Sequence, residues 1–403
     1  MSSDVFVAEN VMTRTVKLIV NHLRNLIGLL LITGIGLCSP TGIGFAQTKN
    51  RDVVSDIDDW KAAESDYILS FPRDHAAHPD HKIEWWYYTG NVTAAGGREF
   101  GYQLTFFRFG VRFNPLNPSR WAVRDLYLAH FAVTDVSRSV HHFDERLNRA
   151  GIGWAGASRQ EFHVWNDDWR TRMEGTVHHL EAVSSDLEFS IDLHLDGNSE
   201  PILHGRDGFS QKGDDVRNAS HYYSLTRLET RGRLTVDGET FDVSGSSWMD
   251  HEFGSSFLEP SQVGWDWFSV QLDDDTDLML YQLRRSDGRL DLHSAGTLVL
   301  NDGAVYALGA SDYELTAGRL WTSDSSGAIY PVDWRIRIPS HGMSLSVTAV
   351  VDDQELETDR STGVTYWEGV IEVAGTSDGV PISGKGYLEM TGYSGPPLST
   401  VLR

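Results

Sequence analysis

The chain has 403 residues and a formal net charge of -23, and 11% of its residues are aromatic. A surface this acidic repels phosphate backbones and anionic lipid headgroups, which excludes nucleic acid as an expected partner. The length is enough for two domains of ordinary size, and aromatic residues favour half-buried β-sheets over helices. The composition therefore predicts an all-β protein with two domains.

The first 46 residues have the features of a signal peptide. Three basic residues precede an apolar run over residues 26–37, and small residues occupy positions 44 and 46, which a signal peptidase reads. The apolar run is about 12 residues long, too short to span a bilayer. We expect cleavage after Ala46, export to the periplasm or secretion, and no stable membrane insertion afterwards. A retained membrane anchor is the alternative.

Cys38 is the single cysteine of the chain. It follows the apolar run, so a lipoprotein anchor is a second alternative, although the bulky Leu37 before it disfavours lipidation. After cleavage the mature chain contains no cysteine, which excludes a disulfide framework and a thiolate nucleophile.

The first half of the mature chain predicts a series of β-strands. Residues 47–59 are polar and acidic, and we expect a mobile lead-in there. A strand begins at residue 83, and a Gly-rich turn at residues 94–97 joins it to a second strand from residue 99. The segment at residues 144–151 is the one predicted helical turn. Further strands are predicted at residues 125–135, 161–165, 171–178, 187–195 and 220–228, and a hairpin at residues 231–243 that turns at Asp237-Gly238.

The same pattern restarts in the second half. One strand is predicted at residues 265–272, a second begins at residue 278, and a third ends at residue 300. Later strands are predicted at residues 304–308, 312–315, 332–338, 343–351, 366–372 and 386–392. Many short strands with regular turns are typical of a sandwich or barrel, and closure into a barrel removes exposed sheet edges.

The two halves also resemble each other. Glu84 stands before an aromatic pair on the first strand of one hairpin, and Arg108 ends its second strand; Asp266 and Arg284 take the same places in the other half. The alternative is that any two aromatic hairpins look this similar. We predict two tandem barrels, at residues 60–256 and 257–403.

Eight sequence blocks carry a resemblance to a known family. They are HPDHKIEWWYYTGNV, GREFGYQLTFFR, LAHFAVTD, HGRDGFSQKG, ASHYYSLTRL, SSWMDHEFGSS, GWDWFSVQL and GYLEMTGY, in this order between residues 71 and 393. Together they resemble the AttH-like, or carotenoid 1,2-hydratase-related, family of lipocalin-like proteins, often labelled predicted secreted hydrolases. The resemblance implies two lipocalin-like antiparallel β-barrel domains in tandem and a hydrophobic small molecule, a lipid or isoprenoid, bound in or between them.

The best understood reaction of that family adds water to a C=C bond of a carotenoid. Such hydration needs a protonated carboxylic acid, an apolar slot and aromatic faces that stabilise a carbocation. Asp266 lies between Trp265 and Trp267, whose rings would desolvate it and raise its pKa, so we predict Asp266 as the acid. Because successive residues of a strand point to opposite faces, Asp266 points away from both Trp265 and Trp267. The aromatic rings around its carboxyl group must therefore come from opposing strands. The predicted ligand-binding residues are Glu84, Trp86, Tyr88, Trp248, Trp265 and Trp267.

Asp250, His251 and Glu252 form a second candidate catalytic group. Either carboxylate could orient His251 as an acid or base. The structural alternative is a buried polar network at a joint between the domains, with tight turns at residues 254–256.

No metal or cofactor is predicted. His75, His78 and His81 have regular short spacing, but Pro79 interrupts them and no metal signature accompanies them. Nucleophilic hydrolysis has little local support: Ser210 lacks a GxSxG elbow, and a solvated turn is expected for Ser210 and Lys212. Three hypotheses remain: a carrier of a hydrophobic molecule, a hydratase that uses Asp266, and a secreted hydrolase.

Overall fold

The computed structural model describes residues 59–115, 119, 121–256 and 258–401. These residues lie within one compact unit that spans residues 53–403. The predicted signal peptide, Cys38 and the lead-in up to residue 58 lie outside the described residues, so export stays a prediction. In the described part of the chain, every helix is too short or too polar to cross a bilayer.

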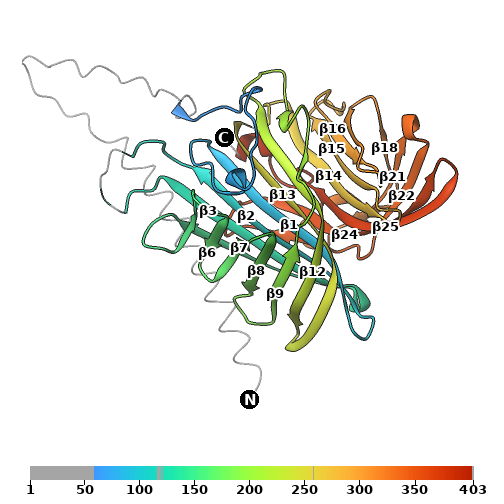
Figure 1. Cartoon of the computed structure of the whole chain (residues 1–403), viewed down its shortest axis with the longest axis horizontal. Coiled ribbons are helices and arrows are strands. Elements are labelled where there is room, and N and C mark those ends of the chain that lie inside the picture. The colour runs from blue at the N-terminus through green and yellow to red at the C-terminus, as the bar shows by residue number, and fades with distance from the viewer. Residues whose placement is uncertain (1–58, 116–118, 120, 257, 402–403) are drawn as a thin grey trace, which may run out of the picture. The chain divides into compact units, whose positions relative to one another are not determined.

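The first large sheet is antiparallel and contains 13 strands (Figure 1). Its order is β4-β3-β2-β1-β13-β12-β9-β8-β7-β6-β5, with β10 and β11 beside β12. A bridge between Ala150 and Ala155 links the chain just after β4 to the start of β5, which brings the two edges of the sheet together. The strands are β1 (Ile83–Ala94), β2 (Glu99–Gly110), β3 (Asp125–Asp135), β4 (Val140–Arg149), β5 (Ala155–Ala157), β6 (His163–Asn166), β7 (Trp169–Glu174), β8 (Val177–Val183), β9 (Phe189–Asp196), β10 (Ile202–Leu203), β11 (Phe209–Gln211), β12 (Ala219–Val236) and β13 (Glu239–Ser256).

The second large sheet contains 10 strands in the order β17-β16-β15-β14-β25-β24-β22-β21-β18, with β23 beside β24, and β19 pairs with β20 separately. The strands are β14 (Gln262–Leu272), β15 (Asp277–Arg285), β16 (Ala295–Val299), β17 (Val305–Gly309), β18 (Glu314–Ala317), β19 (Leu320–Thr322), β20 (Ile329–Pro331), β21 (Asp333–Ile338), β22 (Met343–Ala349), β23 (Glu355–Glu357), β24 (Thr365–Ser377) and β25 (Val380–Met390). The helical elements are short: η2 (Arg73–His75), η3 (Val136–Arg138), η4 (Pro339–His341) and α2 (Leu398–Val401).

Each large sheet encloses its own apolar core, and a third apolar cluster joins them. The third cluster includes Tyr87 and Trp248 from the first sheet and Trp267 and Val370 from the second. Gly101 on β2 permits close contact between the two sheets, because a Cβ at this position would lie 1.9 Å from Cγ2 of Val370 on β24. The prediction of two lipocalin-like antiparallel β-barrel domains in tandem is confirmed. The boundary at residues 256 and 257 stays a prediction.

The predicted helical turn at residues 144–151 is wrong. Residues 140–149 form β4, which pairs with β3 along its whole length. Helix propensity is a weak prior that tertiary pairing overrides, and here the neighbouring strand supplies the hydrogen bonds that a helix would have made internally.

The predicted tight turns at residues 254–256 are wrong, because residues 244–256 are the second half of β13, a central strand that pairs with β1 on one side and β12 on the other. Small residues serve close strand packing here instead of turns: a Cβ at Gly245 would lie 2.0 Å from the carbonyl oxygen of Asn91. Residues 258–261 lead into β14, the first strand of the second sheet.

Candidate functional site

Strand alternation divides the sequence cluster at residues 250–252 between two sites. Asp250 and Glu252 face a cavity between the two sheets, whereas His251 points into the first barrel, where it contacts Glu84. Successive side chains of a strand point to opposite faces, so His251 cannot pair with either neighbouring carboxylate. The predicted acid–base group of these three residues is therefore not formed.

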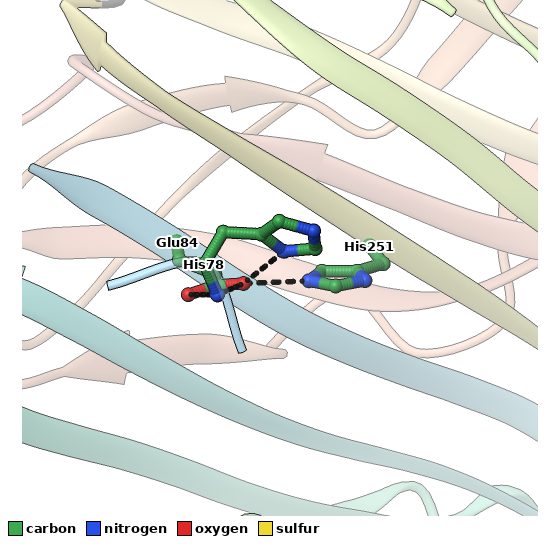
Figure 2. A group of neighbouring side chains, drawn as sticks. All are labelled: His78, Glu84 and His251. Atoms are coloured by element: carbon green, nitrogen blue, oxygen red, sulfur yellow. Dashed lines mark hydrogen bonds and ion pairs between the residues drawn. The ribbon is translucent and has the colours of Figure 1, made fainter. Parts of the chain in front are cut away.

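Inside the first barrel, the Glu84 carboxylate is the centre of a buried polar network. Figure 2 shows the imidazoles of His78 and His251 pointing toward it; His78 Nδ1 and His251 Nε2 each lie 3.0 Å from Oε1. Nε of Arg108 donates to Oε2 at 3.1 Å. Burial alone would raise the pKa of Glu84, but the hydrogen bonds from both imidazoles and the charge of Arg108 lower it well below its usual value.

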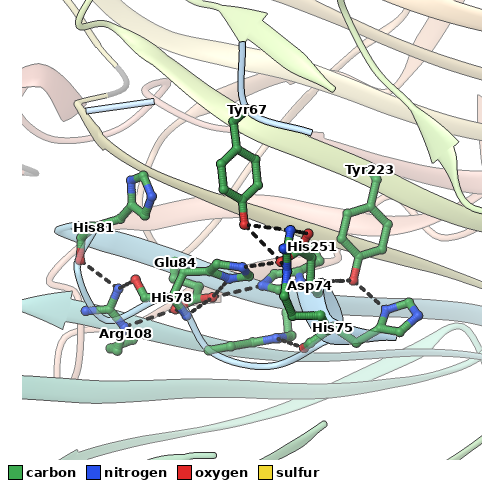
Figure 3. Close-up of polar contacts among 11 residues, drawn as sticks. Tyr67, Asp74, His75, His78, His81, Glu84, Arg108, Tyr223 and His251 are labelled. Atoms are coloured by element: carbon green, nitrogen blue, oxygen red, sulfur yellow. Dashed lines mark hydrogen bonds and ion pairs between the residues drawn. The ribbon is translucent and has the colours of Figure 1, made fainter. Parts of the chain in front are cut away.

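The network extends to both sides of Glu84 (Figure 3). On one side, His78 Nε2 contacts Asp74 at 3.2 Å. On the other, His251 Nδ1 contacts the Tyr223 hydroxyl at 3.0 Å, which in turn lies 2.7 Å from Nδ1 of His75. The network thus ties the loop at residues 71–82 to β1, β12 and β13.

His78, Glu84 and His251 also have the donor types and spacing of a metal site, since their ligand atoms lie within 4.8 Å of one another. The predicted histidine set was different, because neither His75 nor His81 belongs to this group. Glu84 already accepts hydrogen bonds from both imidazoles, and a guanidinium 3.1 Å away repels a cation. The arrangement fits a charge-balanced structural network better than a metal centre.

A cavity of about 150 Å³ lies between the two sheets. A cavity of this size accommodates a ligand built on a single benzene ring. Most of its surface is apolar and aromatic, while four carboxyl groups and one amine interrupt it. The aromatic lining residues are Trp85, Tyr87, Phe107, Phe109, Tyr222, Trp265, Trp267, Tyr281 and Tyr366, and the carboxyl and amine groups are Asp250, Glu252, Glu368, Glu389 and Lys212.

Asp250 is held by three hydrogen-bond donors at the cavity wall. The Tyr222 hydroxyl donates to its Oδ2 at 2.6 Å, Nε1 of Trp248 donates to its Oδ1 at 2.6 Å, and Ser224 also donates to Oδ1. Burial raises the pKa of Asp250 to about 7, although these three bonds to the carboxylate oppose the rise. Asp250 can therefore change its protonation near neutral pH.

Glu252 is paired with the ammonium group of Lys212 at 3.1 Å, and Ser220 donates to the same oxygen. Burial would lower the pKa of Lys212, but Glu252 raises it, so the lysine stays charged. The expected solvated turn is wrong, because Ser210 and Lys212 are both buried. Lys212 is held by Glu252 and cannot serve Ser210 as a base.

Glu368 and Glu389 complete the set of carboxyl groups in the cavity. Burial raises the pKa of Glu389 to about 7 and that of Glu368 well above its usual value. The charge of Glu389 also opposes ionisation of Glu368, and the charges of Asp250 and Glu252 oppose ionisation of Glu389. Glu389 is only half-buried because it faces the cavity. Neither residue was predicted, although a glutamate in an otherwise apolar strand, as in TYWEGVIEV and GYLEM, is the signal that could have indicated them.

Asp266 has different surroundings from those expected of a resting acid. It does not line the cavity, and its Oδ2 lies 3.2 Å from Nε of Arg284. Burial raises its pKa, while Arg284, Tyr393 and Gln282 oppose the rise. This ion pair repeats the pair of Glu84 with Arg108 at the matching place of the other sheet, so the acid and arginine of the internal repeat form structural pairs.

The predicted ligand-binding residues are also divided by strand alternation. Trp265 and Trp267 line the cavity. Trp248 lies behind it and holds Asp250, while Glu84, Trp86 and Tyr88 point into the first barrel. The other face of β1 reaches the cavity instead, through the side chains of Trp85 and Tyr87, which were not among the predicted binding residues.

Comparison with known proteins gives consistent matches. A family profile described as AttH-like matches residues 62–393. A solved structure described as an AttH from Nitrosomonas europaea is 33% identical, with a TM-score of 0.76, and the match covers 83% of this chain and 100% of that one.

Two characterised enzymes are more distant relatives. Kievitone hydratase of Fusarium solani subsp. phaseoli is 20% identical over 244 residues, which is 60% of this chain and 67% of the relative. Dehydratase asqC of Emericella nidulans is 22% identical over 250 residues, which is 60% of this chain and 66% of the relative. The matched part thus spans about two thirds of each enzyme.

Proposed function

This chain belongs to the AttH-like family, and on that basis we propose that it is a lyase of the hydratase or dehydratase type. Its substrate would be an apolar small molecule held in the cavity between the two sheets. The names of two relatives, a hydratase and a dehydratase, support this reaction class.

The observation that carries the proposal is the presence of protonatable carboxyl groups in an aromatic cavity. Burial raises the pKa of Asp250 and of Glu389 to about 7. Addition or loss of water at a carbon–carbon bond needs a group that can donate a proton near neutral pH and a group that can accept one. The cavity offers both.

In the hydration direction, the acid transfers its proton to one carbon of the C=C bond, and the π electrons form the new C–H bond. The other carbon becomes cationic and is stabilised by the ring faces of residues such as Trp265 and Trp267. Water adds to that carbon and gives one proton back to the carboxylate. Dehydration is the reverse sequence.

A carrier of a hydrophobic molecule is the second candidate, because the lining of the cavity is mainly apolar. The two functions differ in what happens to a bound molecule. A carrier releases it unchanged, whereas a lyase returns it with one water gained or lost.

We expect the purified protein to hydrate 4-isopropenylphenol, an uncharged alkene whose ring matches the size of the cavity. Incubation in ¹⁸O-labelled water followed by mass spectrometry measures incorporation of the label. The variant Val364→Trp, which fills the cavity from its wall, should abolish the reaction. Binding of the alkene without label incorporation would contradict the lyase and favour the carrier.

Replacing Asp266 with Asn tests the acid predicted from the sequence. We expect turnover to stay within about twofold of the wild type, because the carboxyl lies outside the cavity and is paired with Arg284. Initial rates of label incorporation are the measurement. A loss of about 100-fold in a variant that remains folded would restore Asp266 as the acid.

A further inference from the structure

Glu368 and Glu389 lie directly opposite each other on neighbouring strands. Glu368 is on β24 and Glu389 on β25, and the register of the antiparallel pair places them as partners. Cβ atoms of directly opposite residues are about 5 Å apart, and like charges at such positions repel each other. Both side chains face the cavity, where desolvation increases that repulsion.

The groups around the pair do not neutralise two negative charges. The neighbours are uncharged donors: Nε1 of Trp265 donates to Glu389 Oε2 at 3.1 Å, and the hydroxyls of Tyr87 and Tyr366 adjoin Glu368. Among the described residues, Glu368 Oε1 and the Tyr87 hydroxyl find no hydrogen-bond partner of good geometry, although both are buried. A buried polar atom left in this way is costly, which indicates that a ligand or a shared proton completes the group.

The charged groups on the other walls of the cavity are already engaged. Asp250 on β13 has its three donors, and Glu252 on the same strand holds Lys212. His130 on β3 is neutral, because burial lowers its pKa to about 3, and it contacts the Tyr366 hydroxyl at 2.7 Å. Glu368 and Glu389 are thus the carboxyl groups of this cavity without a dedicated cation or a full set of donors.

We propose that Glu368 and Glu389 share one proton and that this pair is the acid that protonates the substrate. The inference rests on the proposed hydratase or dehydratase function and names the group that starts its chemistry. In hydration, the shared proton passes to a carbon of the C=C bond, which leaves the pair with two negative charges beside the new carbocation. Water then adds to the cation, and the proton it loses returns to the pair.

The same arrangement selects the substrate by charge. The cavity carries four carboxyl groups against one amine, that of Lys212. An anionic ligand would add to this negative charge and would have to lose its hydration in an aromatic cavity. The substrate class is therefore an uncharged alkene or tertiary alcohol with an apolar skeleton.

Infrared difference spectra across a pH titration test the shared proton without reference to turnover. At neutral pH the wild type should show the C=O stretch of protonated carboxyl groups, and in the double variant Glu368→Gln/Glu389→Gln this band should be weaker by the contribution of the pair, while the contribution of Asp250 remains. The matched control Glu372→Gln, which changes an exposed glutamate of β24 outside this cavity, should keep the band. The single variant Glu389→Gln makes the same comparison if the double variant does not fold.

Deuterium uptake by 4-isopropenylphenol in D₂O tests the acid role, because reversible protonation of its terminal carbon exchanges hydrogen even when no water adds. Uptake should fall by about 100-fold or more in the double variant and stay at the wild-type rate in Glu372→Gln.

Each outcome has a definite meaning. A band that is absent from the wild type, or that has the same intensity in the double variant, overturns the shared proton and leaves the proposed lyase with Asp250 as its remaining acid. Equal deuterium uptake by wild type and double variant overturns the acid role. If deuterium uptake is lost in the double variant but the wild type shows no net hydration, the pair is the acid and the hydro-lyase function is contradicted.

Discussion

Replacing Arg108 with Met is expected to lower the free energy of unfolding by about 3–5 kcal/mol, because it leaves buried carboxylates without their cation. The guanidinium has no exposed surface and lies 3.1 Å from both Glu84 and Asp125. It also donates to the backbone carbonyls of His78 and His81. Urea denaturation followed by tryptophan fluorescence is the measurement.

Arg138 supplies the control for this experiment. Its side chain is 48% exposed and pairs with Asp237 at 2.9 Å, so Arg138→Met should cost less than about 1 kcal/mol. Adding Glu84→Gln to Arg108→Met should recover part of the loss, since it removes one of the unpaired charges. Equal losses for the two arginine variants would show that the network around Glu84 contributes no special stability.

The wild type is expected to lose stability as the pH rises through about 7, and Glu389→Gln to lose less. The folded-state pKa of Glu389 is raised from 4.5 to about 7, so the folded protein binds more protons than the unfolded chain in this range. The stabilisation that Glu389 contributes is complete below its pKa in the unfolded chain, and it disappears as the pH rises through its pKa in the folded protein. At about 1.4 kcal/mol per pKa unit, the shift corresponds to roughly 3 kcal/mol.

The measurement is the difference in unfolding free energy between wild type and Glu389→Gln at about pH 5 and about pH 9. Asp250 has a raised pKa as well and contributes with the same sign to both proteins. Glu372→Gln should follow the wild type at both pH values. A difference that is the same at both ends of the range would contradict a raised pKa for Glu389.

Buried charge has opposite uses at Glu84 and at Glu368. Around Glu84, every carboxylate has a cation or a set of donors, and the result is a fixed loop on a fixed barrel. Around Glu368, the charges are poorly compensated, which costs stability but leaves a proton that can be transferred. We infer that the first arrangement maintains the fold and the second serves the chemistry.

Much of the fold followed from local sequence patterns. The hairpin from residue 83 and the turn at Asp237-Gly238 were predicted because β-favouring residues and turn residues act over a few positions. The segment at residues 144–151 failed because its helical preference is weak and its pairing partner, β3, lies outside any local window. The prediction of turns at residues 254–256 failed because small residues allow either a tight turn or close strand packing.

The site was predicted only in part, and the reason is geometric. Alternation along β13 shows that Asp250 and His251 point opposite ways, but it does not show which of the two faces meets the second sheet. For β1, the residues chosen were Trp86 and Tyr88, whereas Trp85 and Tyr87 are the ones in the cavity. Glu368 and Glu389 are distant in sequence from the central stretch, so no local pattern connected them to it.

The sequence by itself determined that this protein is built from two antiparallel barrels, because strand period, turn residues and aromatic content are local properties that each segment expresses alone. It also determined the repeated acid and arginine of the two hairpins, which form one ion pair in each sheet. Only the tertiary structure decided that this repeat is structural and that the carboxyl groups of the cavity come from β13, β24 and β25. Contact between the sheets depends on residues far apart in the chain, such as Gly101 with Val370, and burial between the sheets is what raises the pKa values on which the proposed chemistry depends.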